Sequence, residues 1–132
     1  MMDQEKFSIK KRFISFIFAF SGLKILITKE HNSRIHLFIA ICVITGSFIF
    51  QINSMEWIVV VLSIGFIFFA EAINTVVEYL CDFVSPQYHE QIRKIKDLAA
   101  AGVLIAAMSV FISGLIIFVP KFFKIWFWNN FQ

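Results

Sequence analysis

The segment FFAEAINTVVEYLCDF, residues 68–83, begins like a membrane-spanning helix and becomes polar near its middle. If the segment is helical, each residue advances by about 100° around the helix axis. The acidic side chains then fall within roughly 60° of one another and, with their polar neighbours, form one stripe along the helix: Glu71, Asn74, Thr75, Glu78 and Asp82. A stripe of carboxylates on a membrane helix requires a counter-charge, and the rest of the sequence indicates what that charge is.

The composition is that of a membrane protein. Of the 132 residues, 59% are hydrophobic and only 16% are charged, which excludes a disordered chain and argues against an ordinary soluble domain. We expect one domain over residues 1–132. The net charge of +3 comes from basic clusters beside apolar runs, which favours contact with anionic lipid headgroups over nucleic-acid binding. Because so short a chain can enclose little space within a bilayer, we expect a homo-oligomer.

The fold class that the sequence predicts is an all-α membrane protein with three transmembrane helices. The predicted spans are residues 35–52, 57–81 and 98–119, each close to the length of about 20 residues that a bilayer requires. A tight turn (51–56) and a polar loop (82–97) are expected to connect them. Pro120 is expected to end the third span, leaving a C-terminal tail (120–132) in which Trp126 and Trp128 would be interfacial anchors.

The segment before the first span has a different pattern. Residues 7–29 carry basic side chains at both ends with apolar residues between them, which predicts an N-terminal amphipathic helix on the membrane surface. No small-residue cleavage site follows the basic N-terminus, so no cleavable signal peptide is expected. Cys42 and Cys81 lie in or near apolar runs and are expected to be reduced core thiols.

The distribution of Lys and Arg predicts the orientation. Seven precede the first span, none lie in the turn 51–56, three lie in the loop 82–97 and two follow the third span. The positive-inside rule places the N-terminus and the 82–97 loop in the cytoplasm and the C-terminus outside. Glu71 then lies about 21 Å along a helix that enters from outside near Trp57, which places it in the inner half of the bilayer and Glu78 near its cytoplasmic surface.

These carboxylates favour a function within the membrane. A charged side chain at mid-bilayer costs about 2.5–3.5 kcal/mol of insertion free energy, so intramembrane acids are functional candidates. The structural alternative, hydrogen bonding between helices, suits one polar residue better than a stripe of repelling carboxylates. Glu30, Glu71, Glu78 and an amide oxygen are ligands that suit Mg²⁺, and Lys96 would meet phosphate. This combination suggests phosphoryl transfer from a nucleotide to a molecule in the bilayer.

Four segments carry a resemblance to a known family: AFSGLK, KEHNSRIHL, EAINTVVEYLCD and YHEQIRKIKDLAAAGVLIAA. Together they resemble the bacterial integral-membrane diacylglycerol kinase family, which includes the undecaprenol kinases, over roughly residues 11–119. The resemblance implies an amphipathic surface helix, three membrane helices and a homotrimer whose active sites are shared between subunits. It also implies ATP and Mg²⁺ as requirements. The chain has neither a P-loop nor protein-kinase motifs, as is true of this family.

The resemblance also implies roles for individual residues. Glu71 takes the position of the catalytic base that removes the proton of the lipid hydroxyl, Glu30 and Glu78 take the metal-binding positions, and Asn74 lies one turn from the base. Lys96 would neutralise the transferred phosphoryl group and Asp97 would lie on the nucleotide side. Arg34 and Arg12 are further candidates for contacts with lipid or nucleotide. Val76 departs from the family pattern, which has a small residue there.

The sequence leaves alternatives open for the lipid substrate and for the class of function. NSRIHL and GLIIFVPK resemble the undecaprenol kinase branch more than the diacylglycerol branch, so undecaprenol is favoured over diacylglycerol, with undecaprenyl phosphate or phosphatidic acid as product. A small oligomeric transporter that uses Glu71 for proton or ion coupling would explain the buried acids, but not Glu30, Lys96 and Asp97 at the cytosolic ends. A third alternative, a purely structural subunit of an assembly, explains these residues least well. The three histidines show no metal-binding spacing, and His89 is expected to be a structural hydrogen-bonding group.

Overall fold

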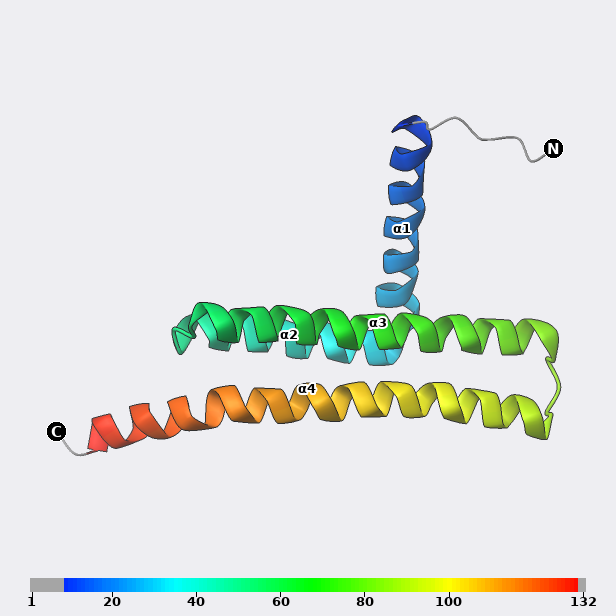
Figure 1. Cartoon of the computed structure of the whole chain (residues 1–132). Coiled ribbons are helices and arrows are strands. Elements are labelled where there is room, and N and C mark those ends of the chain that lie inside the picture. Colours follow the sequence, from blue (N-terminus) through cyan, green and yellow to red (C-terminus); the bar gives the residue numbers. More distant parts are fainter. Residues whose placement is uncertain (1–8, 131–132) are drawn as a thin grey trace.

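The computed structural model describes residues 9–130, apart from the side chains of Lys10 and residues 128–130. These residues form α1 (Ile9–Lys29), α2 (His31–Ile49), α3 (Ser54–Val84) and α4 (Glu90–Asn130). Helices α2, α3 and α4 run side by side, and α1 stands across their common direction (Figure 1). The predicted all-α class is confirmed for the described part of the chain.

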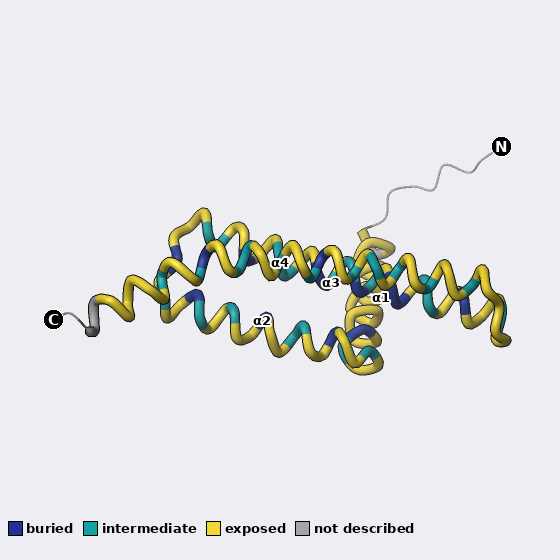
Figure 2. The backbone as a smooth tube through the Cα atoms, turned by 90° about the horizontal axis from the view of Figure 1, so that it is seen from below, coloured by how far each residue is buried: buried dark blue, intermediate teal, exposed yellow. Residues whose placement is uncertain are grey.

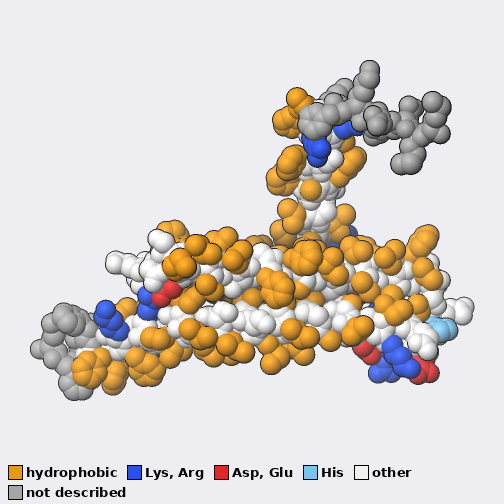
Figure 3. Space-filling model, viewed as in Figure 1, with side chains coloured by type: hydrophobic (Ala, Val, Ile, Leu, Met, Phe, Trp, Pro, Cys, Tyr) orange, Lys and Arg blue, Asp and Glu red, His pale blue; other side chains and the backbone are white. Residues whose placement is uncertain are grey.

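Three of these helices are long and apolar enough to cross a membrane. Among the described residues they are His31–Ile49, Ser54–Val84 and Glu90–Phe127, which confirms the three predicted spans. In the view of Figure 3, apolar side chains cover the length of the bundle, and the charged side chains gather toward its two ends. The chain is a membrane protein whose three long helices fit the bilayer.

Helix α1 covers the predicted surface helix. The expected range was 7–29, and α1 begins at Ile9, the first described residue. Its C-terminal end meets the bundle, where Leu26 is buried. A helix that stands across three spanning helices has the direction that a position on the membrane surface requires (Figure 1). Its amphipathic character and its position on the surface stay predictions.

The turn between α2 and α3 has well-defined ends. Gln51 has a φ of 47°, a left-handed conformation that a right-handed helix cannot continue through, so α2 ends at Ile49 and not at the predicted residue 52. Asn53 and Glu56 form a capping box: the Asn53 side chain accepts from the Glu56 amide at 3.0 Å, and the Glu56 carboxylate accepts from the Asn53 amide at 2.7 Å. Helix α3 therefore begins at Ser54, before the predicted residue 57.

The loop between α3 and α4 is shorter than the predicted range 82–97. Helix α3 continues to Val84 and α4 begins at Glu90, so only residues 85–89 connect them. Residues 90–97 are helical, and two pairs of opposite charge one turn apart support this helix: Lys94 with Glu90 at 2.7 Å and Arg93 with Asp97 at 3.7 Å. The ring of His89 accepts from the backbone amide of Gln91 at 3.2 Å, which confirms its structural role at the start of α4.

The prediction that Pro120 ends the third helix is also wrong. Helix α4 passes through Pro120 and continues to Asn130, so residues 120–130 are helical and not an irregular tail. Proline removes the donor that would pair with the carbonyl four residues earlier, but helices in membranes tolerate this loss. Beyond the proline, Lys121 pairs with Glu56 of α3 at 3.0 Å, which ties this part of α4 to the start of α3.

The buried core is small and lies where the α2–α3 turn meets α4. Ile52, Val60 and Ile117 form it, and the rings of Phe50 and Phe118 pack edge to face at 5.9 Å against it. Elsewhere most residues are exposed, and the buried residues lie where helices face one another (Figure 2). Cys42 is exposed, contrary to its expected place in the core, while Cys81 is buried; both thiols are free, as expected. The exposed apolar faces are those that lipid or a second copy would cover.

Candidate functional site

Glu71 lies at the centre of the candidate site, on the side of α3 that faces α2. Its side chain is only 2% exposed, and one carboxylate oxygen, Oε1, lies 3.3 Å from Nε2 of His36. The pair is within ion-pair distance but is not aligned as a hydrogen bond, and Oε1 has no hydrogen-bond partner in the described part of the chain. A buried carboxylate with so little compensation is costly for a structural residue and is suited to accept a proton or a hydrogen bond from a ligand.

The next turn of α3 adds an amide and a second carboxylate. Nδ2 of Asn74 donates to Oε1 of Glu78 at 2.8 Å, so Asn74 fixes this carboxylate. Both Asn74 and Thr75 are buried, and Asn74 Oδ1 and Thr75 Oγ1 lack hydrogen-bond partners among the described residues. The predicted polar stripe is therefore real, and its buried part carries several free acceptors.

Helix α2 runs antiparallel to α3 and completes this polar layer. Tyr79 of α3 donates its hydroxyl to Oε1 of Glu30 at 3.2 Å, at the residue that precedes α2. Because His36 faces Glu71 and Glu30 faces Tyr79, the register places Ser33 opposite the turn between these pairs. Ser33 is fully buried, and its hydroxyl also lacks a partner within residues 9–130. The polar side chains of the site thus come from successive turns of α2 and α3.

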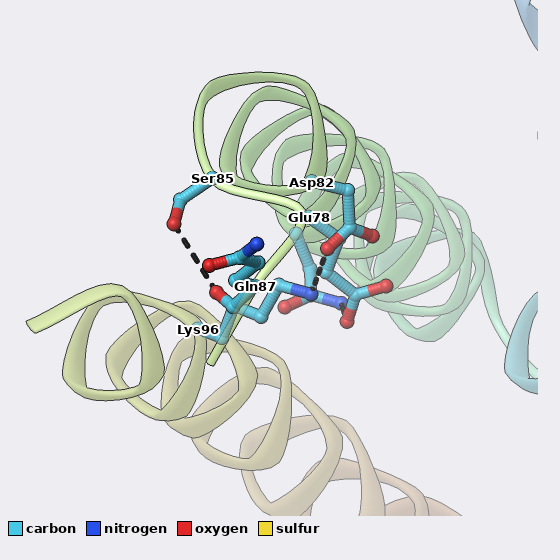
Figure 4. A network of polar contacts seen from close by, with 6 residues as sticks. Glu78, Asp82, Ser85, Gln87 and Lys96 are labelled. Atoms are coloured by element: carbon cyan, nitrogen blue, oxygen red, sulfur yellow. Dashed lines mark hydrogen bonds and ion pairs between the residues drawn. The ribbon is translucent and has the colours of Figure 1, made fainter. Parts of the chain in front are cut away.

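Lys96 of α4 reaches the stripe from the third helix. Its ammonium group binds Oδ1 of Asp82 of α3, and it lies close enough to Glu78 for the two charges to interact. Figure 4 shows Lys96 pointing toward Asp82 and Glu78 across the gap between the helices, with Ser85 and Gln87 of the connection beside them. The hydroxyl of Ser85 donates to the carbonyl of Gln87 at 3.1 Å and so shapes this connection.

The structure brings together Glu30, Glu71, Asn74, Glu78 and Lys96 of the predicted set, but not its remaining members. Asp97 pairs with Arg93 on the exposed face of α4. Arg34 is exposed, and its Nη2 lies 3.5 Å from the ring of His31. Arg12 lies in the first turn of α1, at the end remote from the bundle (Figure 1).

The oxygen donors of this site are of the chemical type that Mg²⁺ prefers. Glu30 and Glu78 each use Oε1 in a hydrogen bond and keep a second oxygen, and both charges act on Glu71. The described residues contain no group of three or more His, Cys, Asp or Glu side chains that could hold a metal by themselves. Mg²⁺ favours one or two carboxylates together with phosphate oxygens and water, so two carboxylates and the buried amide oxygen of Asn74 suit it.

The chain is similar in sequence to known proteins. A family model described as prokaryotic diacylglycerol kinase matches residues 17–118. The chain belongs to the prokaryotic diacylglycerol kinase family. An undecaprenol kinase of Bacillus subtilis is 32% identical over 113 residues, which cover 86% of this chain and 92% of that protein. A diacylglycerol kinase of Synechocystis is 32% identical over 108 residues, which cover 81% of this chain and 62% of that protein.

Family membership settles the class of activity. The relatives are named kinases of lipids, and this family member is a membrane lipid kinase. The resemblance that the sequence motifs suggested is confirmed, and a transporter or a purely structural subunit is disfavoured. The match ends at residue 118, so the last part of α4 lies outside it.

Sequence reasoning missed His36 and Tyr79. Apart from the thiol of Cys42, His36 is the only ionisable residue of the predicted span 35–52, and this could have marked it as a partner for the acids of the second span. Tyr79 gave no comparable signal, because its hydroxyl becomes relevant only when the register of α2 against α3 brings it to Glu30.

Proposed function

We propose that this protein transfers the γ-phosphate of ATP to the hydroxyl of a membrane lipid alcohol, in a reaction that requires Mg²⁺. The observation that carries this proposal is Glu71, a carboxylate buried within the membrane bundle beside His36 and one turn from the Asn74–Glu78 pair, in a chain of a lipid kinase family. A buried, under-coordinated acid at this point is what a lipid hydroxyl needs to lose its proton.

Glu71 acts as the general base. Its carboxylate accepts the proton of the lipid hydroxyl as the alcohol oxygen forms its bond to the γ-phosphorus. The bond between that phosphorus and the bridging oxygen of ATP breaks, and ADP leaves with the electron pair. His36 Nε2 lies 3.3 Å from Glu71 Oε1 and would hold the carboxylate in place. Such transfer depends mainly on positioning and on neutralisation of charge.

Glu30 and Glu78 would hold Mg²⁺ on the cytosolic side of Glu71. Tyr79 and Asn74 fix these two carboxylates by the hydrogen bonds already described. When bound, the ion supplies positive charge to the phosphate oxygens. Asn74 would contribute its buried carbonyl oxygen, either to the ion or to a water that the ion carries.

Lys96 would bind the phosphates of the nucleotide. Its present partner, Asp82, lies at the surface end of the stripe, so phosphate can compete for the ammonium group in an exposed setting. Asp97, on the adjoining exposed face of α4, is proposed to lie on the nucleotide side. Arg34 and Arg12 are proposed as weaker contacts to lipid headgroup or nucleotide.

Undecaprenol is the favoured acceptor over diacylglycerol. The relative named undecaprenol kinase is covered over nearly its whole length, whereas the chain spans less than two thirds of the relative named diacylglycerol kinase. We also propose a single lipid kinase domain in a homotrimer with shared sites, with the N-terminus and the α3–α4 connection in the cytoplasm. The exposed apolar faces of the helices are compatible with such an assembly.

The test is to purify the protein in detergent and supply ATP labelled at the γ-phosphate together with undecaprenol or diacylglycerol. We expect label on the lipid, more on undecaprenol than on diacylglycerol at equal concentration, and none when Mg²⁺ is chelated. Absence of label on both lipids would overturn the proposal. Equal or greater labelling of diacylglycerol would overturn only the preference between the two acceptors.

A further inference from the structure

The buried side-chain polar atoms that lack a hydrogen-bond partner in the described part of the chain all lie in one layer between α2 and α3. They are Oγ of Ser33, Oε1 of Glu71, Oδ1 of Asn74 and Oγ1 of Thr75. Ser33 is 0% exposed and Thr75 is 6% exposed. Buried polar atoms without partners are rare, because each has lost its hydration without compensation. Their concentration in one layer indicates a polar ligand that the protein holds there.

The register of the two helices brings the hydroxyls of Ser33 and Thr75 to the same level. Two contacts between α2 and α3 fix this register: the Tyr79–Glu30 hydrogen bond and the His36–Glu71 pair. Ser33 lies midway between the two α2 residues of these contacts, three positions from each. Thr75 lies midway between the two α3 residues, four positions from each. The two buried hydroxyls therefore belong to one site that is shared by the two helices.

Other hydroxyls of the membrane helices satisfy themselves within their own helix. Four of them donate to the carbonyl oxygen four residues earlier, at 2.8–2.9 Å: Thr45, Ser47, Ser109 and Ser113. This is a common way for a buried serine or threonine to avoid an unpaired hydroxyl. Thr75 does not use the equivalent acceptor, the carbonyl of Glu71. Its hydroxyl therefore keeps both its donor and its acceptor for a ligand.

The donors and acceptors of this layer suit a water molecule. The hydroxyls of Ser33 and Thr75 need an acceptor for their protons, which a metal ion does not supply, whereas Oε1 of Glu71 needs a donor. A water both donates and accepts. Because Asn74 Oδ1 already has a proposed role beside Mg²⁺, three atoms remain, and a buried water typically makes about three hydrogen bonds to otherwise unpaired groups.

We propose that Ser33 and Thr75 hold a water between α2 and α3, and that this water carries away the proton that Glu71 takes from the lipid alcohol. This inference rests on the proposed function, in which Glu71 must lose that proton before the next turnover. The O–H bond of the protonated Glu71 breaks as its proton passes to the held water. That water passes one of its own protons to solvent water, beyond the level at which Tyr79 is 50% exposed. Glu71 returns to the carboxylate, and the held water is regenerated.

The first experiment detects the water in the unaltered protein without any substrate. Isotope-labelled protein in lipid bilayers is studied by solid-state NMR, with magnetisation transferred from water protons to the protein. We expect transfer to Ser33 and Thr75 at a mixing time at which Ser47 receives none. Ser47 is the matched control, since it is 0% exposed on the same helix as Ser33 but its hydroxyl donates to the Val43 carbonyl at 2.8 Å. Transfer to Ser33 and Thr75 as slow as to Ser47 overturns the proposal.

The second experiment measures turnover with Mg-ATP and undecaprenol. The double variant Ser33→Ala, Thr75→Val removes both hydroxyls, and we expect kcat to fall about 100-fold, the lower end of what positioned proton transfer contributes, with the KM for ATP unchanged. Ser47→Ala should keep the kcat of the unaltered protein. The double variant Ser33→Thr, Thr75→Ser keeps both hydroxyls and should retain most of the turnover.

The outcomes of the kinetic experiment separate the proposal from a loss of packing and from a failure of the proposed function. An unchanged kcat in Ser33→Ala, Thr75→Val overturns the proton route. An equal fall in Ser47→Ala, or in the variant that keeps both hydroxyls, also overturns it, because the cause would then be packing. If the unaltered protein releases no ADP in response to lipid, the proposed function fails and the proton route fails with it. The water site is then decided by the NMR result alone.

Discussion

His36 and Glu71 show how one contact between helices can set the chemistry of a buried acid. Each residue is an ionisable side chain within an apolar segment, and α2 and α3 bring Nε2 of His36 and Oε1 of Glu71 to 3.3 Å in a buried setting. In a buried setting such an electrostatic contact is stronger than the same contact at a surface. His36 is therefore a positioning residue for the base, and its effect should appear in turnover.

We predict that His36→Leu lowers kcat by up to about 100-fold, the size of effect that a displaced catalytic group gives, with little change in the KM for ATP. His36→Gln, which keeps a donor, should recover part of the loss. His31→Leu on the exposed side of α2 is the control and should behave like the unaltered protein. A turnover in His36→Leu equal to that of the control would remove His36 from the mechanism.

Lys96 and Lys94 offer a matched pair of lysines. Both form ion pairs, Lys96 with Asp82 across helices and Lys94 with Glu90 within α4, but only Lys96 lies near Glu78. We expect Lys96→Met to lower kcat about 100-fold or more, because the phosphates lose a positive charge that stabilises the transition state. Lys94→Met should lose less than twofold. Similar losses in both variants would point to general electrostatics and not to a nucleotide contact.

At the scale of the helices, the ends are determined by specific residues. The capping box of Asn53 and Glu56 begins α3, and Glu56 also binds Lys121 of α4. We predict that Asn53→Ala lowers the free energy of unfolding by about 1 kcal/mol, because the Glu56 amide loses its acceptor. Asn53→Asp should retain most of the stability. Thermal unfolding in detergent, followed by circular dichroism, measures both, and a stable Asn53→Ala protein would show that the cap contributes little.

The helices were predictable where apolar residues decide the structure, and less so elsewhere. Three apolar runs predicted three spans, and the spacing of Glu71, Asn74 and Glu78 predicted their common face. The ends of α4 were not predictable in the same way. Residues 90–97 are polar but helical, with ion pairs one turn apart supporting the helix. Pro120 lies inside α4, as membrane helices tolerate.

At the scale of the whole molecule, the site depends on register between helices, which sequence alone does not give. Glu71 could be expected to be a functional candidate from its own helix, and its proposed role as base came from the resemblance. Its contact with His36 and the Glu30–Tyr79 bond need α2 placed against α3. Asp97 was expected in the site by resemblance, yet it pairs with Arg93 on an exposed face, because adjacent residues on a helix point about 100° apart.

The orientation of the molecule in the membrane is a further prediction. In a variant with Cys42 and Cys81 replaced by serine, Ser85→Cys should react with a membrane-impermeant maleimide only from the cytoplasmic side. Ser54→Cys should react only from the outside, because these two residues lie at opposite ends of α3. Inside-out and right-side-out vesicles separate the two cases. Reaction of Ser85→Cys from outside would reverse the proposed topology.

The most direct test of the central claim is the turnover of Glu71→Gln. Glutamine preserves the size and hydrogen-bonding ability of the side chain but cannot accept the proton of the lipid hydroxyl, and a general base contributes about 10²–10⁴-fold to the rate. With purified protein, Mg-ATP and undecaprenol, we predict that lipid-dependent release of ADP falls by at least that lower factor while the protein remains folded. Full turnover in Glu71→Gln would contradict the account.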